Sequence, residues 1–409
     1  MTDNPFSSET FVKIWSESFG KQKTRTKIKG IGKIEFYEQG RVFINLGKTI
    51  TKGIYYTTDN AISLKGKTCL VYDVPSYFAC PLTFPSKGSK LKKIKQYPGF
   101  LIELHLFNSL QDFMQKKFKK SSRYKLNKYR RRLTQCFEIK YKMYRNEMGK
   151  SEFELIFEKF KLLLQKRFEG KGEHNNNLDH KEWKFYKKVA FPMIQKGDAG
   201  LFTIFNGDEP IAITLTYFSK DIIFDAITVF NIDYAKFHLG SVNIMLLIQW
   251  GIENQFKILD FSKGYFDYKT RWATKQYDFE YHILSDPKSP MSIISAFFLG
   301  NFFAFKQYLR ERNLNLLLSK FRFALKSKKK DAEVSKEKIS KRLIFKNFDP
   351  KSNYSLTRVD ANEHEVKKML FEFLYLYGEA SKNVVIYKID DMGQYLFKGS
   401  KTDKIASFT

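Results

Sequence analysis

The segment DFSKGYFDYKTRW, from Asp260 to Trp272, gathers acids, bases and aromatic residues directly after an apolar run, FKIL. The apolar run predicts a buried strand, and loops that follow buried strands often carry functional groups. Lys269 and Arg271 are suited to holding a phosphate or a carboxylate group, Arg271 with a two-pronged fork. A desolvated Lys269, or Tyr268, could also move a proton while an amine attacks a carbonyl group. The segment is therefore a candidate catalytic loop.

The same segment also has a purely structural interpretation, in which Asp260 pairs with a cation and the aromatic residues pack beneath the loop. Because the strand before Asp260 is apolar, we expect its carboxylate to be partly buried and to need a partner. Lys269 and Arg271 are the nearest cations in the sequence, and we expect one of them to be that partner. Gly264 provides a backbone conformation, or a close approach for a ligand, that other residues disfavour.

A second candidate site lies in the loop KFHLGSVN, just before an apolar helix that we expect over about residues 241–254. The first N–H groups of a helix lack partners, and together with the helix dipole they bind anions. His238, Gly240, Ser241 and Asn243 are the candidates for such a phosphate site. Ser241 could instead serve only as the N-cap of the helix.

A run of ten cations without any acid extends from Lys116 to Arg132, in the sequence KKFKKSSRYKLNKYRRRL. Leu126, Tyr129 and Leu133 form one apolar stripe, which predicts a helix with a strongly basic outer face. Like charges one turn apart repel each other, so a run without interleaved acids is not typical of an ordinary solvated face. An anionic donor, tRNA or anionic lipid could each be the counterpart.

Composition supports an anionic partner and narrows the class of protein. The chain has 409 residues and a net charge of +29, which attracts phosphate-rich ligands, nucleic acid or acidic membrane surfaces. The three cysteines form no C-x-x-C pair, which favours a reducing compartment. We expect no metal site, because H-x-x-x-H motifs are lacking, and no P-loop. The polar N-terminus and the short apolar stretches predict a cytoplasmic protein. A peripheral position at the inner membrane, on an anionic membrane surface, is compatible with this prediction.

The order of the expected elements indicates an α+β fold. They are helices that begin with capping boxes at Ser109, Ser151 and Asp179, three antiparallel strands within residues 199–230, the apolar helix, and the strand that leads to Asp260. Such an order suits an antiparallel sheet that splays where its helix enters. The later segment MSIISAFFLGNFFAF could lie in a membrane interface, but we expect a core helix of the second half.

Five segments in this order and spacing resemble one known family. They are SSRYKLNKYRRRL, GDEPIAITLTYF, DIIFDAITVF, HLGSVNIMLLIQWGIEN and FKILDFSKGYFDYKTRW. Together they resemble the CelD-like (cellulose-biosynthesis-protein-like) acyltransferases of the GNAT superfamily, which are related to the FemAB peptidyltransferases. The resemblance covers about residues 121–272. FSSETFVKIWSESFG fits the first half of the family more loosely, and the loop at Gly240 lacks the superfamily's second glycine.

The resemblance implies tandem GNAT-like halves with mixed, largely antiparallel sheets, plus a small C-terminal α/β appendix. We expect the halves at residues 1–120 and 121–320, a charged helix or linker at 321–342, and the appendix at 343–409. It also implies transfer of an acyl group from acyl-CoA or acyl carrier protein, as co-substrate, to an amine acceptor. The pathway would be the synthesis of cell-envelope polysaccharide or lipid.

By this resemblance, Tyr268, Lys269 and Asp260 are the expected catalytic residues. The acceptor would contact Lys263, Gly264, Arg271, Trp272 and Arg123, and the donor would contact His238, Gly240, Ser241 and Asn243. Two alternatives stay open. One is a FemAB-like transferase that uses aminoacyl-tRNA, and the other is a non-catalytic basic adaptor on a membrane or nucleic acid.

Overall fold

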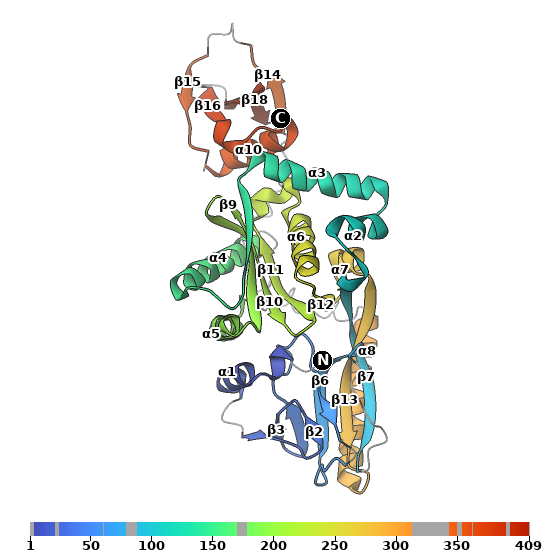
Figure 1. Ribbon diagram of the computed structural model, residues 1–409. Coiled ribbons are helices and arrows are strands. Elements are labelled where there is room, and N and C mark those ends of the chain that lie inside the picture. Colours follow the sequence, from blue (N-terminus) through green and yellow to red (C-terminus); the bar gives the residue numbers. More distant parts are fainter. Residues whose placement is uncertain are drawn as a thin grey trace.

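The computed structural model describes residues 4–20, 24–59, 61–78, 88–169, 178–312, 343–349, 354–361, 363–389 and 393–408. These residues form a large mixed sheet with helices on both of its faces and a separate small sheet near the C-terminus (Figure 1). The architecture is α+β with largely antiparallel sheets, as the sequence predicts. The expected charged segment 321–342 lies outside the described residues.

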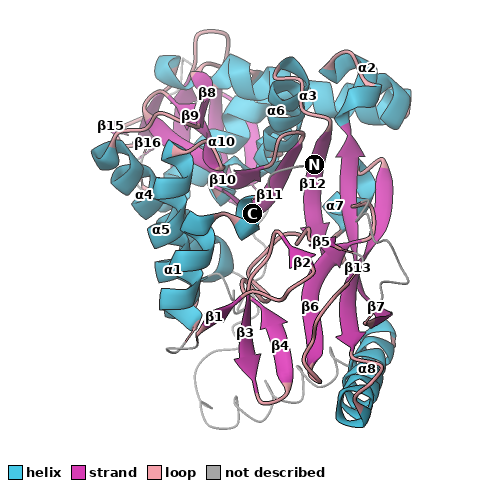
Figure 2. Cartoon of the chain, turned by 60° about the horizontal axis from the view of Figure 1, so that its bottom comes forward, coloured by secondary structure: helices cyan, strands magenta, loops and turns pink. Residues whose placement is uncertain are grey.

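The large sheet has eleven strands (Figure 2). Their order across the sheet is β1 (Arg25–Thr26), β3 (Phe36–Gln39), β4 (Val42–Asn45), β6 (Thr68–Pro75), β13 (Lys275–Ser285), β7 (Lys90–Glu103), β12 (Ile258–Lys263), β11 (Ile222–Phe230), β10 (Glu209–Phe218), β9 (Ala199–Asn206) and β8 (Ile139–Tyr144). Each half contains one parallel pair, β4 with β6 and β11 with β12. This repeated feature marks the two tandem halves. A two-stranded sheet, β2 (Ile31–Gly32) with β5 (Thr57–Thr58), lies beside the first half.

The long strand β7 joins the two halves. Its residues Lys90–Leu101 pair with β13, whereas Gly99–Glu103 pair with β12 on the other side. β13 in turn pairs with β6. β13 therefore lies between two strands of the first half, β6 and β7. Its residues 275–285 nevertheless fall inside the range that the sequence predicts for the second half. The domain boundaries stay a prediction.

The helices divide into two groups, one on each face of the sheet. One group is α1 (Glu9–Phe19), α4 (Lys150–Glu169) and α5 (His180–Gln195), which share a core with one face of β10. The other is α2 (Leu110–Lys117), α3 (Lys120–Cys136) and α6 (Leu239–Glu253), which share a core with the opposite face. Because both faces of the central strands are buried, these strands are apolar almost throughout.

Two of the three expected helix caps are present. Ser109 accepts a hydrogen bond from the N–H of Asp112, and Asp179 accepts one from the N–H of Lys181. The third expectation is wrong, because α4 begins at Lys150 and so contains Ser151 within its first turn. The apolar stripe of α3 is confirmed, since Leu126 and Leu133 are fully buried.

The C-terminal appendix is a five-stranded antiparallel sheet with one helix. Its strand order is β14 (Leu343–Asn347), β18 (Asp403–Phe408), β17 (Gln394–Lys398), β16 (Val385–Ile389) and β15 (Leu356–Arg358), and its helix is α10 (His364–Tyr377). α10 packs against α3 and the 3₁₀ helix η4 (Ile232–Phe237), where Lys236 and Glu372 form an ion pair of 2.8 Å. Figure 1 shows the appendix at one end of the molecule, beside α3.

Two further helices follow β12. α7 (Asp267–Trp272) lies in the loop after that strand, and α8 (Pro290–Glu311) packs on β6, β7 and β13. The expectation that α8 is a core helix of the second half is wrong. It lies on first-half strands, and much of its apolar surface is exposed. Within the described part of the chain, no helix is both long enough and apolar enough to cross a bilayer.

Candidate functional site

The candidate site lies where the parallel strands β11 and β12 separate. They pair only from Ile222 to Phe224 and from Ile258 to Asp260, and beyond these residues the two strands diverge. On β12, the register with β7 shifts between Asp260 and Lys263, and Ser262 has a φ of 60°. A positive φ is uncommon for residues other than glycine and is often found at functional sites. We call the space between the diverging strands the wedge.

Asp260 lies at the base of the wedge and is completely buried. Its carboxylate accepts hydrogen bonds from the hydroxyl groups of Tyr277 (2.7 Å) and Tyr77 (2.8 Å) and from the N–H of Ser262 (2.7 Å). Burial raises its pKa to about 6, although these three hydrogen bonds act in the opposite direction. The expected ion pair with Lys269 or Arg271 is wrong, because neutral donors already satisfy this carboxylate.

Lys269 is the central cation of the wedge, and only 4% of its surface is exposed. Its Nζ donates hydrogen bonds to the carbonyl groups of Lys263 (2.8 Å) and Ser262 (3.2 Å). Burial lowers its pKa to about 8, and the nearby charge of Lys52 contributes to this shift. Gly264, with a φ of 115°, allows the turn that brings those carbonyl groups to the amino group. Lys263 itself forms an ion pair of 2.5 Å with the buried Asp73.

Two charged residues that the sequence analysis did not select complete the wedge. Asp225 is buried on β11 and accepts a hydrogen bond from the hydroxyl group of Thr228 (2.8 Å). Burial raises its pKa, while the charges of Lys269 and Lys52 lower it. The sequence shows Asp225 as an isolated acid on a strand, and nothing near Lys52 in the sequence distinguishes it from other lysines. Asp225 reaches the site through the pairing of β11 with β12, whereas Lys52 reaches it only through the packing of the two halves.

Tyr268 and Arg271 lie on α7 at the mouth of the wedge. The ring of Tyr268 meets that of Phe261 edge to face at 5.9 Å; although 41% of the residue is exposed, desolvation raises the pKa of its hydroxyl group. Arg271 is exposed, and its charge helps to lower the pKa of His238, for which burial is the larger cause. Trp272 is different. It is buried between the rings of two core phenylalanines, so the expected role in substrate binding is corrected to a packing role.

The start of α6 holds three of the four residues expected to contact the donor. His238 is the N-cap residue, with a φ of 49°, and its ring stacks on that of Tyr129 at 3.9 Å. Gly240 and Ser241 are half-buried in the first turn, so Ser241 is not the N-cap. Asn243 is fully buried, and its side chain donates a hydrogen bond to Thr214 (3.0 Å). The expectation that Asn243 contacts the donor is therefore wrong.

Comparison with known families agrees with this geometry. Residues 120–270 match the family described as an acetyltransferase (GNAT) domain. The chain contains a GNAT domain. This domain includes α3, the meander β9–β11, α6, β12 and most of α7. It therefore contains the second-half strands and helix that form the wedge, which are β11, β12 and α7. No curated protein matches the sequence.

Several solved structures are similar to the chain at low identity. FemX is 10% identical, with 68% of this chain and 92% of that chain covered and a TM-score of 0.46. The C-terminal domain of a putative lysylphosphatidylglycerol synthetase from Agrobacterium fabrum is also 10% identical, with 72% and 95% covered and a TM-score of 0.43. A conserved protein of unknown function from Bacteroides thetaiotaomicron has 9% identity, 69% and 90% coverage, and a TM-score of 0.45. At these TM-scores the similarity carries no argument about activity.

A basic groove borders the start of α6 in the GNAT domain. It has a volume of about 790 Å³ and lies between α3 and α10. Its lining is Lys119, Lys120, Ser121, Tyr124, Lys125, Lys128, Tyr129 and Tyr375. We call it the lysine groove. Tyr129 connects it to the α6 terminus, because this ring is the one that stacks on His238. Of the ten cations from Lys116 to Arg132, only Lys116 has a carboxylate oxygen within 4.0 Å among the described residues.

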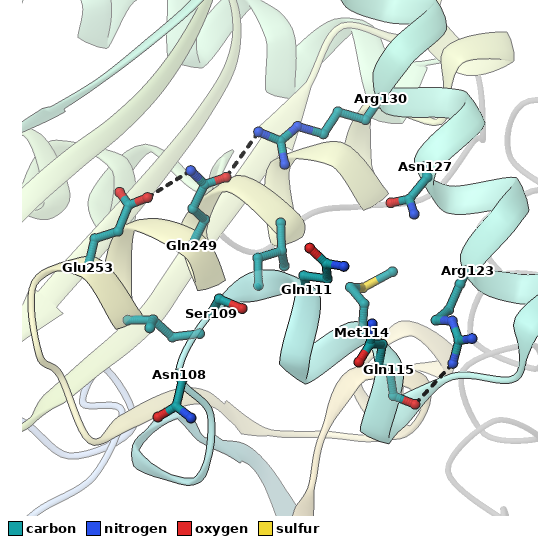
Figure 3. Close-up of a pocket in the computed structure, with 12 residues that line it drawn as sticks. Asn108, Ser109, Gln111, Met114, Gln115, Arg123, Asn127, Arg130, Gln249 and Glu253 are labelled. Carbon is teal, nitrogen blue, oxygen red and sulfur yellow. Dashed lines mark hydrogen bonds between the residues drawn. The ribbon is translucent and has the colours of Figure 1, made fainter.

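A second cavity, of about 830 Å³, lies at the opposite end of α6, between the GNAT domain and α2 (Figure 3). Its polar lining comes from α2, α3 and α6, where Arg130 donates a hydrogen bond to the side chain of Gln249 (3.0 Å). Arg123 lies in this cavity, and its guanidinium group donates to the carbonyl groups of Gln115 and Phe118 at the end of α2. The structure therefore places Arg123 apart from the wedge, and the expected acceptor contact is not supported.

Proposed function

We propose that the protein is an N-acyltransferase that moves an acyl group from a thioester to an amine. The observation that carries this proposal is the position of the Lys269 Nζ, which is buried in the wedge with two carbonyl partners and a pKa of about 8. In neutral lysine, the two N–H groups satisfy these two carbonyl groups and leave the lone pair unoccupied. That lone pair is suited to taking the proton that an attacking amine loses.

The residues of the wedge supply the proton transfers that this reaction requires. The amine nitrogen attacks the carbonyl carbon of the thioester, the C–N bond forms, and the C–S bond breaks. The amine loses one proton to Lys269, and the leaving sulfur gains one. The Tyr268 hydroxyl stays protonated, because burial raises its pKa, and it is suited to donating to that sulfur. Asp225 adds a carboxylate that attracts a cationic amine acceptor, which must first release one proton to solvent so that its neutral nitrogen can attack.

The donor would lie along the start of α6 and the lysine groove. His238, Gly240 and Ser241 surround the helix terminus, and helix termini of this kind bind phosphate groups. The four lysines of the groove lie next to it and have no carboxylate partner among the described residues. This arrangement supports a donor with several phosphate groups, such as acyl-CoA, or a phosphopantetheine arm on an acidic carrier protein.

The length of α3 supports a second candidate donor, aminoacyl-tRNA. The helix has 17 residues, which corresponds to roughly 25 Å of basic surface, longer than a single pyrophosphate needs. A nucleic acid backbone would use the whole surface. A non-catalytic basic adaptor is the third candidate. An acceptor from cell-envelope polysaccharide or lipid synthesis belongs to the proposal through the family resemblance alone.

Ligand-induced stabilisation tests the donor class. The melting temperature of the purified protein should rise with acyl-CoA or acyl carrier protein, because a ligand that binds only the folded state stabilises it. A rise with tRNA alone, with a steep salt dependence, would favour the second candidate. Release of free thiol on addition of amines then tests the reaction. Stabilisation by thioesters without thiol release from any of a broad set of amines would contradict the proposed activity.

A further inference from the structure

The outer face of α8 is an exposed apolar surface that the proposed transfer reaction does not use. It consists of Met291, Ile293, Ile294, Phe297, Phe298, Phe302, Phe305 and Tyr308, with exposed fractions from 45% to 67%. We call it the α8 face. Large contiguous apolar patches of this kind are rare on soluble monomers and mark interaction surfaces. In Figure 2, α8 lies at the periphery of the molecule, beyond β7 and β13.

The sequence of α8 separates this face cleanly from the side that packs on the sheet. Ser292, Ala296, Gly300, Phe303 and Gln307 are buried at spacings of three or four residues, and Phe303 stacks on Tyr281 at 4.0 Å. Small residues on this side let the helix approach the sheet closely. The bulky residues therefore point away from the protein, because the packed side already has its own apolar contacts.

Cations surround the α8 face and identify the charge of its partner. Residues 290–305 carry no charge, whereas Lys288 precedes them and Lys306, Arg310 and Arg312 follow, so these cations outnumber the flanking acids Asp286 and Glu311. The side chain of Lys92 lies across Gly300, since an added Cβ there would be 2.7 Å from its amino group. The sequence continues with seven basic residues and no acid from Arg312 to Lys330. An apolar helix face with a basic border is the pattern of helices that lie in the surface of an anionic bilayer.

A cationic pocket opens beside the α8 face. It has a volume of about 350 Å³, and its lining includes Phe302 of that face together with Lys48, Lys263, Lys306 and Arg310. Asp73 is the only acid in this lining, and it already pairs with Lys263. Burial and the charges of Arg310, Lys48 and Lys263 lower the pKa of Lys306. The pocket therefore has an excess of positive charge, which suits an anionic headgroup.

The exposed aromatic surface continues from α8 to the mouth of the wedge. The guanidinium group of Arg310 lies 4.4 Å from the ring of Tyr97, which in turn lies 6.1 Å from that of Tyr265. Tyr265 and Phe266, next to α7, are 63% and 59% exposed. Aromatic side chains are favoured at the boundary between lipid and water. The surface that would face a bilayer thus includes the loop of the candidate site.

We propose that the α8 face lies in the interface of an anionic phospholipid bilayer, with the basic residues around it contacting the headgroups. This proposal does not depend on the transfer reaction. A second copy of the chain is a poorer occupant, because it would bring two basic borders together on a protein with a net charge of +29. Lysine and arginine side chains near an anionic surface each add to membrane binding.

Vesicle sedimentation with the full chain tests the proposal. We expect binding to vesicles of equal parts phosphatidylcholine and phosphatidylglycerol, and little binding to phosphatidylcholine alone. Phe298→Ser combined with Phe302→Ser should weaken binding about tenfold or more, because two exposed phenyl groups no longer enter the interface. The control is Leu155→Ser, which removes an even more exposed apolar side chain (74%) from α4, and it should bind like the wild type.

A second measurement separates insertion of α8 from adsorption of the basic helix α3. Phe298→Trp should show fluorescence quenching by brominated lipids in anionic vesicles, beyond that of the wild-type protein. No added quenching, or unchanged binding of the double serine variant, would overturn the proposal. Two outcomes would identify another occupant. If the wild type were a dimer and the double serine variant a monomer, the occupant would be a second copy of the chain. If the double serine variant had a much lower melting temperature, another part of the same chain would cover the α8 face.

Discussion

The hydroxyl group of Tyr77 donates a hydrogen bond of 2.8 Å to the carboxylate of Asp260, and so joins the first half of the chain to the base of the wedge in the second. The rings of Tyr77 and Tyr277 also meet nearly at right angles, at 4.6 Å. Both hydroxyl groups therefore hold one buried carboxylate. This arrangement makes Asp260 a positioning residue for the turn that presents carbonyl groups to Lys269.

Asp260→Asn should lower the stability of the protein. The substitution replaces one carboxylate oxygen by an NH₂ group, which cannot accept, so at least one of the hydrogen bonds that two tyrosines and Ser262 divide between the two oxygens is lost. Leaving buried donors without an acceptor costs about 1–3 kcal/mol. Thermal unfolding measures this loss. The exposed Asp267→Asn is the matched control, and equal melting temperatures for the two variants would contradict the role of Asp260.

The stability difference between the wild type and Asp260→Asn should depend on pH. Burial raises the pKa of Asp260 from 3.8 in the unfolded chain to about 6 in the folded protein. The folded state then binds the proton more tightly, so this group stabilises the protein at low pH and loses that contribution as the pH rises through about 6. The wild type should therefore lose stability relative to the variant between pH 3.8 and 6. A difference that is constant across this range would contradict the shift.

Turnover should rise with pH as Lys269 becomes neutral. Its pKa is lowered to about 8, so the form with a free lone pair increases as the pH rises through this value. Lys269→Ala should lower the rate of thiol release about tenfold or more and remove this pH dependence. Lys275→Ala, at an exposed position on β13, is the control. A pH profile that Lys269→Ala leaves unchanged would show that another group accepts the proton.

Gly240→Ala should destabilise the start of α6. A Cβ at this position would lie 2.7 Å from the ring of Phe230, closer than carbon atoms approach each other. Overpacking of this kind costs about 1–3 kcal/mol. Phe230→Leu in the same chain should restore part of the loss, because the smaller side chain makes room for the methyl group. Chemical unfolding of the single and double variants measures the coupling, and purely additive effects would contradict the contact.

Lys125→Gln combined with Lys128→Gln should weaken donor binding and flatten its salt dependence. Both lysines line the groove beside the α6 terminus, so their charges act directly on a phosphate-rich donor. Arg131→Gln removes a neighbouring charge that does not line the groove, and it should change affinity less. Calorimetry at several salt concentrations makes the comparison. If the double lysine variant and Arg131→Gln lowered the affinity equally, the donor would be attracted by the general positive charge of α3 and not by a site in the lysine groove.

Much of the fold followed from local patterns in the sequence. Alternating and continuous apolar runs predicted the meander β9–β11 and the strand before Asp260, and the capping residues Ser109 and Asp179 marked two helix starts. These features depend on residues within a few positions of each other, so they can be predicted from the sequence alone. The GNAT domain was predicted differently, from the resemblance of five segments to a known family over about residues 121–272, and the family match at residues 120–270 agrees with it.

The partners of buried charges could not be predicted in this way. The sequence placed Asp260 beside Lys269 and Arg271, yet its donors are Tyr77 and Tyr277, which β13 and the first half bring to it. A buried carboxylate bonds to whatever donor the packing places within reach, and sequence distance does not limit that choice.

By itself, the sequence determined the GNAT-like α+β architecture, the basic helix α3 and the loop that carries Lys269. Only the tertiary structure decided that Lys52 and Asp225 share the wedge with Lys269, that Asn243 and Trp272 belong to the core, and that α8 turns its phenylalanines outward. Amphipathic patterns show that a helix has two faces, but the face that becomes buried depends on the surface it meets. For α8, the small side chains fit closely against β7 and β13, and this contact left its bulky apolar face exposed.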